Sequence, residues 1–203
     1  MQDPLRISCV RNMEFYPSEA KVPEELRTDE FVLRPLRVIH AEMDYAALMD
    51  SKESLRMMSQ SSWPSDDFTL EENRADLQEH EKEHIEREAF TYTVLDSTGD
   101  TCLGCIYIEH LKEGPMKGDH AAMLRFWVRQ PRLADDLDRR VLDALMEWFR
   151  KDWAFSRVVF TIADVDERQR QLAKDLDLRL VRSYGGKWSE YLILDQSDSS
   201  TPG

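Results

Sequence analysis

The sequence predicts a single α/β (α+β) domain with a mixed, mostly antiparallel sheet of about seven strands flanked by about four helices. Short apolar runs rich in β-branched and aromatic residues recur along the chain, and segments with helical spacing of apolar residues alternate with them. The length of 203 residues suits one domain. We place this domain at 31–194, with an N-terminal arm over 1–30 and a disordered tail over 195–203.

The expected strands are apolar runs that end at polar or glycine-containing turns. Pro35 places the first of them near a sheet edge or a bulge. Two runs on either side of the Gly99 turn form a hairpin, a third run follows a polar turn, and Gly185-Gly186 marks a second hairpin. The expected strands are 31–37, 89–95, 102–111, 121–128, 157–163, 180–184 and 187–194.

The expected helices differ in how much of their surface they bury. Apolar residues recur at helical spacing after Leu137, so that helix buries one face, and acidic residues at its start suit the positive end of its dipole. The segment 70–88 contains many helix formers and 8 acidic against 3 basic residues, which indicates a long, mostly solvated helix. The expected helices are 43–48, 70–88, 137–149 and 167–176.

The composition is acidic, with 27 Lys and Arg against 40 Asp and Glu and a formal net charge of −13. Proteins that bind nucleic acid normally present a basic surface to the phosphates. No segment approaches the ~18 consecutive apolar residues of a membrane span, and the first residues lack the basic-then-apolar order of a signal peptide. We therefore expect a cytoplasmic protein with neither nucleic acid nor membrane as partner.

Two short motifs match metal-binding or redox patterns. Residues 80–84 read H-E-K-E-H, an H-E-x-x-H pattern, but the flanks are charged and the residue six positions beyond His84 is Phe90 instead of a third ligand. We expect two surface histidines and no metal. Cys102 and Cys105 spell C-x-x-C within an apolar run, and we expect reduced cysteines on opposite faces of a strand.

Several landmarks occur in an order and spacing that are more specific than any one of them. They are the opening strand 31–36, the hairpin strand 103–108, the strand ending in Phe126-Trp127-Val128, the helix 137–149, the strand 158–162 and the segment 176–179. In this order the chain resembles the GNAT superfamily of acyl-CoA-dependent N-acyltransferases, in particular the branch that includes ribosomal-protein N-terminal acetyltransferases. The resemblance covers residues 31–194.

The resemblance implies acetyl-CoA as the cofactor, bound where the strands ending at Val128 and beginning at Arg157 separate. In the family, the first of these strands bonds the pantetheine arm through its backbone, and a glycine-rich loop wraps the pyrophosphate at the start of the next helix. Two glycine positions of that loop fall on Ala134 and Asp136. The cofactor-binding residues implied are Phe126, Trp127, Val128, Arg132, Leu133, Ala134, Asp135, Asp136, Leu137, Asp138 and Arg139.

This loop allows two interpretations. Three carboxylates stand where the pyrophosphate would lie, and like charges at close range disfavour binding. Four flanking arginines give the loop a local balance of +4 − 3 = +1 and restore phosphate binding if they pair with the phosphates. Alternatively, the aspartates are helix N-caps that fill the anion site themselves.

The resemblance also guides the search for acid and base. The family's proton-donating Tyr falls on Ala173, so that group is missing, and Tyr184 and Tyr191 are the downstream tyrosines that could replace it. The family's general base falls on His120, whose side chain has a pKa suited to deprotonating an ammonium. Glu109 and His110, where the preceding strand ends, are the other candidate bases. The alternative for His120 is a solvated residue of a polar turn.

The link 57–68 supplies the candidate acceptor-binding residues, Trp63 and Phe68. Aromatic rings beside carboxylates suit an amine. The alternative is that both rings anchor the link to the core.

We therefore expect transfer of an acetyl or other acyl group from CoA to a primary amine of a small molecule or peptide, by direct attack in a ternary complex. No cysteine is placed as a nucleophile. The alternative function is a catalytically impaired GNAT-fold binding or scaffolding module that does not use acetyl-CoA, with a homodimer as a possible form.

Overall fold

The structure is a computed structural model that describes residues 13–196. These residues form eight strands, five α-helices and two 3₁₀ helices. The strands are β1 (Leu26–Arg27), β2 (Phe31–Pro35), β3 (Ala89–Asp96), β4 (Cys102–His110), β5 (Ala121–Val128), β6 (Arg157–Ala163), β7 (Arg179–Ser183) and β8 (Trp188–Asp195). The helices are α1 (Ala41–Met49), α2 (Lys52–Ser59), α3 (Leu70–Glu86), α4 (Leu137–Asp152) and α5 (Glu167–Asp175), with 3₁₀ helices at Val38–His40 and Gln130–Asp135.

All eight strands form one sheet in the order β1-β2-β3-β4-β5-β6-β8-β7. Every neighbouring pair is antiparallel except β5 and β6, which are parallel. The expected mixed, mostly antiparallel sheet is therefore confirmed, with one strand more than predicted. The tail expected from 195 onward begins inside β8, and residues 197–203 lie outside the described part of the chain.

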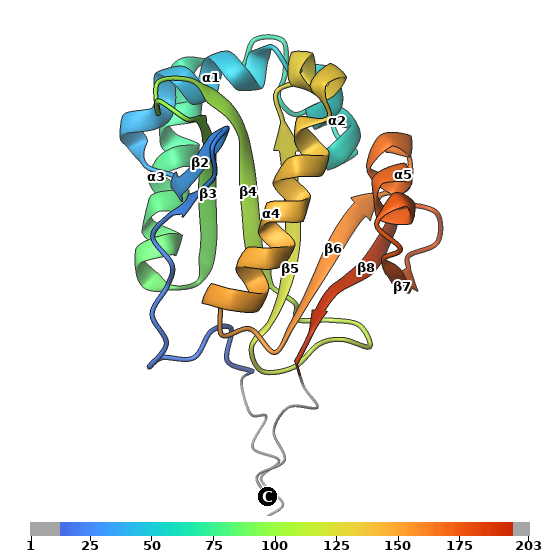
Figure 1. Cartoon of the computed structure of the whole chain (residues 1–203). Coiled ribbons are helices and arrows are strands. Elements are labelled where there is room, and N and C mark those ends of the chain that lie inside the picture. Colours follow the sequence, from blue (N-terminus) through green and yellow to red (C-terminus); the bar gives the residue numbers. More distant parts are fainter. Residues whose placement is uncertain (1–12, 197–203) are drawn as a thin grey trace, which may run out of the picture.

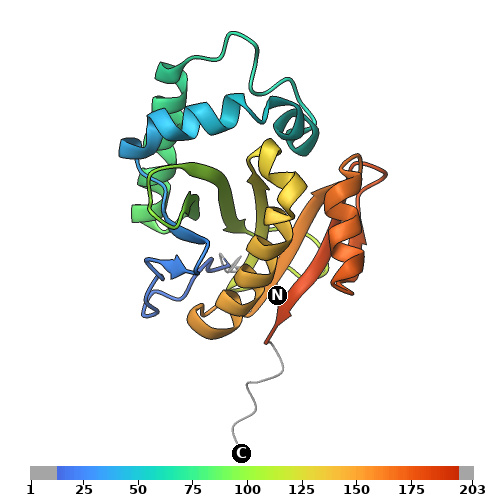
Figure 2. The ribbon, with the colours of Figure 1, turned by 45° about the horizontal axis from the view of Figure 1, so that its top comes forward.

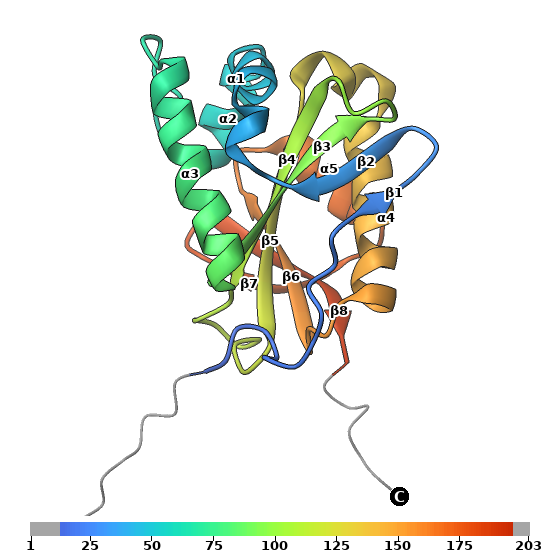
Figure 3. The same cartoon turned by 90° about the vertical axis from the view of Figure 1, so that its left-hand side faces the viewer.

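Helices cover both faces of the sheet (Figures 1 and 3). Residues of α4 and α5 share one core with alternate residues of β3 to β6, whereas α1, α2 and α3 form the second core on the opposite face. In α4, seven of sixteen residues are buried, including Val141, Leu145 and Phe149 at the spacing of one helical face. The helical periodicity seen after Leu137 is thus the contact surface of α4 with the sheet.

The described part of the N-terminal arm is packed against the domain. Phe15 stacks on Phe90 at a centroid distance of 5.2 Å, and Tyr16 lies edge-on to Phe155 at 4.9 Å. The Tyr16 hydroxyl also accepts a hydrogen bond from the Ala154 amide, at 3.1 Å. The arm is therefore packed on the domain over residues 13–30, and the first twelve residues lie outside the described part.

The parallel strands β5 and β6 pair over only part of their length. The register runs from Ala121 opposite Arg157 to Leu124 opposite Phe160, and both strands continue beyond the last pair. Figure 1 shows them diverging toward the start of α4, and Figure 2, in which this end is tilted toward the viewer, shows this start between α2 and α5. We call the space between the unpaired ends the strand gap.

Two elements were not expected from the sequence. The helix α2 has only eight residues and buries Leu55 and Met58, so its apolar pattern is too short to register as periodicity. The strand β1 has two residues and exists because it pairs with Leu33 and Val32 of β2. Both depend on tertiary contacts.

Candidate active site

The strand gap is closed by a side chain from α5. Gln169, which is 9% exposed, donates from Nε2 to the backbone oxygen of Phe126 at 2.9 Å. Phe126, Trp127 and Val128 line a cavity of about 70 Å³ together with residues of α2 and α5. A volume of this size holds about two water molecules, at roughly 30 Å³ each. The separation of the two strands that the sequence predicts is present. The Phe126 backbone oxygen at this gap, however, already accepts a hydrogen bond from Gln169.

The first turn of α4 faces the first turn of α5 across a second cavity of about 300 Å³, which we call the α4–α5 groove. Here Arg168 makes a bidentate pair with Asp138, with Nε at 2.6 Å and Nη2 at 2.8 Å from the two carboxylate oxygens. Arg168 Nη2 also lies 3.1 Å from an oxygen of Asp136. The Asp138 side chain is only 5% exposed, so this pair is shielded on the acid's side. The groove is lined by Asp136, Asp138, Arg139, Arg168, Gln171, Leu172 and Asp175.

The aspartates are ion-pair partners and do not cap the helix. Asp136 is the residue before α4, with a φ of 55°, and no side chain caps this helix start. The alternative in which the aspartate side chains cap the helix is therefore wrong, because a left-handed residue at this position directs its side chain away from the first-turn amides. These amides remain available to an anion.

The loop before α4 is held by the N-terminal arm. Glu30 accepts from Arg140 Nε at 2.6 Å and from Arg132 Nη2 at 3.2 Å. Arg132 also pairs with Asp135 at 3.0 Å, and Arg129 pairs with Asp50. Arg139 keeps only a long pair of 3.7 Å to Asp143, and both side chains are about half exposed. Among the four flanking arginines, Arg139 thus has the weakest internal pairing.

The remaining residues of this loop take different positions. Leu133 lines the strand gap, Ala134 is exposed, and Leu137 is buried in the core beneath α4. The eleven residues predicted to bind cofactor therefore divide between the gap, the groove, the core and the surface of the loop, where Arg132, Ala134 and Asp135 lie.

A third cavity, of about 310 Å³, lies on the other face of the sheet, and we call it the β-face cavity. The residues of its floor come from four adjacent strands, β4, β5, β6 and β8. Arg125 lies between Met123 and Trp127 along β5, and all three side chains are on the face opposite α4. Arg125 Nη2 lies 2.6 Å from Glu109 Oε2. The lining residues are Glu109, Met123, Arg125, Thr161, Tyr184, Trp188 and Glu190.

Three neighbouring residues of this floor carry buried polar atoms without a hydrogen-bond partner in the described structure. These atoms are Arg125 Nε, Thr161 Oγ1 and Glu190 Oε2. Glu190 is only 2% exposed, and its other oxygen accepts from the Tyr184 hydroxyl. A buried polar atom without a partner costs about 1–3 kcal/mol. Such atoms are rare in folded proteins, and three of them side by side indicate a place where a ligand binds.

Tyr184 belongs to this cavity, whereas Tyr191 does not. Burial and the hydrogen bond to Glu190 raise the pKa of Tyr184 to about 12, so its hydroxyl stays protonated at neutral pH. The Arg182 guanidinium covers the ring at 3.7 Å. Tyr191 instead packs against the core on the α4 side.

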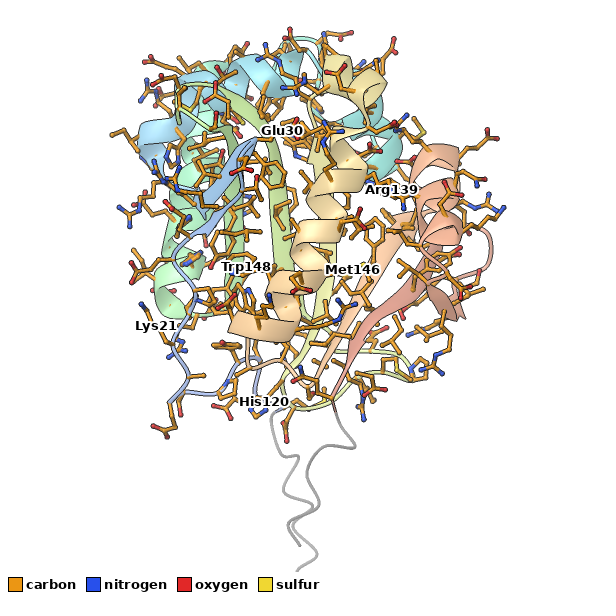
Figure 4. The ribbon with its side chains drawn as sticks, in the orientation of Figure 1. Lys21, Glu30, His120, Arg139, Met146 and Trp148 are labelled. Carbon is orange, nitrogen blue, oxygen red and sulfur yellow. The ribbon has the colours of Figure 1, made fainter. Side chains whose placement is uncertain are left out.

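Two of the candidate bases, Glu109 and His120, lie in different places. Glu109 lines the β-face cavity. His120 precedes β5 at its paired end, where its Nε2 lies 3.1 Å from Glu14 and its backbone N–H donates to the Glu14 oxygen at 2.7 Å. At roughly 3.3 Å per strand residue, His120 lies about 26 Å along the strand from Val128. Figure 4 shows His120 and Arg139 at opposite ends of the molecule.

Trp63 and Phe68 contact each other edge-on at 6.0 Å in the link between α2 and α3. Phe68 is buried in the core of the α1–α3 layer, with Trp63 packed against it. The Tyr45 hydroxyl donates to the Phe68 backbone oxygen at 2.9 Å. These contacts are those of a loop anchor.

The two histidines of α3 are half-buried between solvent and the sheet. His84 packs edge-on to Phe90 and Tyr92, both at 5.2 Å, and burial lowers its pKa. His80 lies 5.6 Å from the Tyr107 ring. The histidines expected at the surface are therefore half-buried, because α3 packs on β3. Within residues 13–196, no group of three or more His, Cys, Asp and Glu side chains could hold a metal ion.

Cys102 and Cys105 are free, buried thiols on the same face of β4. The expectation of opposite faces is wrong because a bulge between Val94 and Leu95 shifts the register by one residue. Burial raises the pKa of Cys102 to about 12 and that of Cys105 well above its usual value. Neither thiol is therefore a reactive thiolate at neutral pH.

Comparison with known proteins agrees with this architecture. The family model of the acetyltransferase (GNAT) domain matches residues 30–179. RimL, a ribosomal L7/L12 α-N-protein acetyltransferase solved with coenzyme A, is 17% identical with a TM-score of 0.66, covering 86% of this chain and all of its own. Ribosomal-protein-S5-alanine acetyltransferase from Vibrio fischeri is 15% identical with a TM-score of 0.62, covering 84% and 94%. MccE, a microcin C7 self-immunity acetyltransferase solved with acetyl-CoA and AMP, is 12% identical with a TM-score of 0.63, covering 81% and 92%.

No curated protein matches the sequence at a significant level. In the described part of the chain, no helix is both long and apolar enough to cross a membrane. At these low identities the solved structures establish the fold, and the family follows from the matched domain. The family model spans most of the chain, from the residue before β2 to the start of β7, and the chain therefore belongs to the GNAT acetyltransferase family.

Proposed function

We propose that this protein transfers an acyl group from CoA to a primary amine. Membership of the GNAT family supports acyl transfer and does not favour the scaffolding alternative. The observation that carries the proposal is the arrangement of the three cavities. The α4–α5 groove and the strand gap share Asp138 and Arg168, and the β-face cavity begins at Arg125 and Thr161, the residues next to the last β5–β6 pair. A donor and an acceptor on opposite faces of the sheet would therefore meet at the end of this pairing.

The fit of CoA to these residues depends on the start of α4. Its uncapped first-turn amides, Arg139 and Arg168 offer hydrogen-bond donors to phosphate oxygens. Asp136 and Asp138 oppose an anion, but Arg168 already neutralises part of their charge. The donor set thus fits the anionic half of CoA, and affinity is lowered by the carboxylates.

In this proposal Arg139, Arg168 and the α4 amides hold the phosphates, while Phe126 to Val128 and Leu133 line the passage for the pantetheine arm. When bound, acetyl-CoA supplies an acyl group activated as a thioester. Gln169 must then release the Phe126 oxygen, since a pantetheine arm that bonds to the backbone of this strand competes for the same acceptor.

Glu109 is the base that the geometry favours. It lines the β-face cavity, is partly exposed to solvent, and is positioned by Arg125. A carboxylate here attracts an ammonium group and accepts its proton, directly or through water. His120 lies at the paired end of β5 and is a less suitable candidate.

The similarity in fold to ribosomal-protein acetyltransferases supports a protein or peptide amine as acceptor.

Calorimetric titration of acetyl-CoA into the protein tests the donor side. Arg139→Glu is expected to weaken binding about 10-fold or more, because it replaces a phosphate donor with a like charge. Arg150→Glu is the matched control, since Arg150 lies near the other end of α4 with a long pair of 3.7 Å to Glu147. Absence of binding to the unmodified protein would overturn the proposal.

Turnover of acetyl-CoA with an amine acceptor tests the base. Glu109→Gln is expected to lower kcat by about 10²–10⁴ while leaving the acetyl-CoA dissociation constant unchanged. Unchanged kcat would exclude Glu109 as the base.

A further inference from the structure

We propose that the β-face cavity recognises an α-amino carbonyl group, with the amine nitrogen held by Glu190 and the neighbouring oxygen held by Arg125. This inference rests on the proposed function, because it assigns the acceptor of the same reaction. It makes Arg125 and Glu190 the residues that determine acceptor specificity.

The geometry begins with the register of three strands. Thr161 of β6 lies directly opposite Glu190 of β8. Leu124 of β5 lies opposite Phe160 of β6, so Arg125 and Thr161 are the next residues on these two strands. All three side chains line the same cavity and form one row across the sheet. Thr161 and Glu190 are paired residues on neighbouring strands, about 5 Å apart, and Arg125 lies one residue beyond the last β5–β6 pair, so the row has the scale of a small ligand.

Each residue of this row contributes one unused hydrogen-bonding atom of a different kind. Arg125 Nε is a donor, Glu190 Oε2 is an acceptor, and Thr161 Oγ1 can act as either. Other atoms of two of these side chains do have protein partners, since Arg125 Nη2 pairs with Glu109 and Glu190 Oε1 accepts from Tyr184. Arg125 Nε, Thr161 Oγ1 and Glu190 Oε2 have none in the described structure. A complementary ligand therefore offers an oxygen acceptor and a nitrogen donor a short distance apart.

An α-amino carbonyl group has these two features on adjacent carbons. A simple alkylamine would satisfy Glu190 but leave Arg125 Nε unpaired, and a carboxylic acid without an amine would do the reverse. Two carboxylates against one guanidinium give the row and its neighbour Glu109 a net charge of −1, which favours a cationic nitrogen. The chemistry occurs in two sources, a free amino acid and the first residue of a peptide.

The direct test measures binding of small probes to the full-length protein in the absence of CoA, by saturation-transfer NMR. Glycinamide carries both groups, ethylamine lacks the oxygen, and acetamide lacks the ammonium. We expect glycinamide to bind at least 10-fold more tightly than either single-group probe. Equal binding of glycinamide and ethylamine would overturn the inference without any variant. Tighter binding of glycine than glycinamide identifies a free amino acid as the source, and the reverse order identifies a peptide.

Two conservative substitutions assign the contacts. Arg125→Lys removes Nε and is expected to reduce glycinamide to the affinity of ethylamine while leaving ethylamine unchanged. Glu190→Gln keeps the shape and can still accept from Tyr184, and it is expected to weaken both amines at least 10-fold without affecting acetamide. Arg150→Ala, on the exposed side of α4, is the control for both. If both variants still bound glycinamide more tightly than ethylamine and acetamide, as the unmodified protein is expected to, the assignment of these contacts to Arg125 and Glu190 would be contradicted.

Failure of this inference can be separated from failure of the proposed function. If acetyl-CoA binds in calorimetry but the probes show no preference, only the acceptor assignment is wrong. If the probes are discriminated but acetyl-CoA does not bind, the cavity recognises its ligand and the transferase proposal is wrong.

Discussion

The α4–α5 groove and the β-face cavity have nearly the same volume, about 300 and 310 Å³, yet they treat their polar groups in opposite ways. In the groove, the buried carboxylate of Asp138 has both oxygens bound by Arg168. In the β-face cavity, Arg125, Thr161 and Glu190 each keep a buried polar atom unused. The buried carboxylate of the groove thus has its hydrogen bonds without a ligand, whereas three buried polar atoms of the β-face cavity have none in the described structure.

This contrast indicates how the two sites would bind. A ligand of the groove competes with existing ion pairs, so its affinity is reduced by the cost of displacing them. A ligand of the β-face cavity completes hydrogen bonds that the protein leaves open, so its chemical identity matters more. Stability measurements can test the contrast directly, because removing a group should have opposite effects in the two places.

Arg168→Ala should have the largest effect. It leaves Asp138 buried without its cation, and loss of one partner of a buried pair costs about 3–5 kcal/mol. Because the Arg168 side chain is 42% exposed, we expect a loss of about 3 kcal/mol in the free energy of unfolding by urea.

The double variant Arg168→Ala, Asp138→Asn should recover more than half of this loss, since the uncompensated charge is gone. A single-variant loss equal to that of Arg150→Ala, an exposed pair worth less than about 0.5 kcal/mol, would contradict the paired groove.

A buried carboxylate without a cation extends the comparison. Asp44 accepts from Asn73 at 3.1 Å, and burial raises its pKa from 3.8 to about 6. The folded state then binds more protons than the unfolded state between these values, so the stability due to this group is present at low pH and falls as pH rises from about 4 to 6.

Asp44→Asn should therefore stabilise the protein by about 1–2 kcal/mol at pH 7 and by nothing near pH 4. Urea unfolding at the two pH values measures the difference. A gain that is the same at both would show that the charge of Asp44 is not responsible.

Thr161→Val should have the smallest effect and the opposite sign to Arg168→Ala. Valine has the shape of threonine without the hydroxyl, so the substitution removes a buried unpaired atom and should raise stability by about 1 kcal/mol. Thermal unfolding followed by circular dichroism detects this gain. A loss of stability would show that the hydroxyl has a partner and that the row is already satisfied.

The fold was largely predictable, because its signals are local. The strands 121–128 and 157–163 were predicted with the observed bounds, since each is an apolar run between polar turns. The faces of Cys102 and Cys105 were not predictable, because a bulge depends on how two strands pair. The helix α2 was missed for the same reason, since its two buried residues become meaningful only beside the sheet.

The site was less predictable than the fold. Counting back along β5 selected His120 without knowing at which end the strands separate. Arg168 lies thirty residues from Asp138, and no local pattern connects them. Glu190 did leave a signal, because it is the one carboxylate in the interior of strand β8, whose last residue is Asp195, but its importance appears only when Thr161 and Arg125 line up beside it.

The N-terminal arm has a consequence for the order of folding. Tyr16 contacts residues 154 and 155, Glu14 contacts His120, and Glu30 contacts Arg140, so each partner is synthesised more than a hundred residues later. During translation this segment leaves the ribosome more than a hundred residues before its partners and must wait for them. Contacts of such long sequence separation form late and slow the folding reaction. The arm can therefore complete its contacts only after residues up to 155 have been synthesised, although it precedes them in the chain.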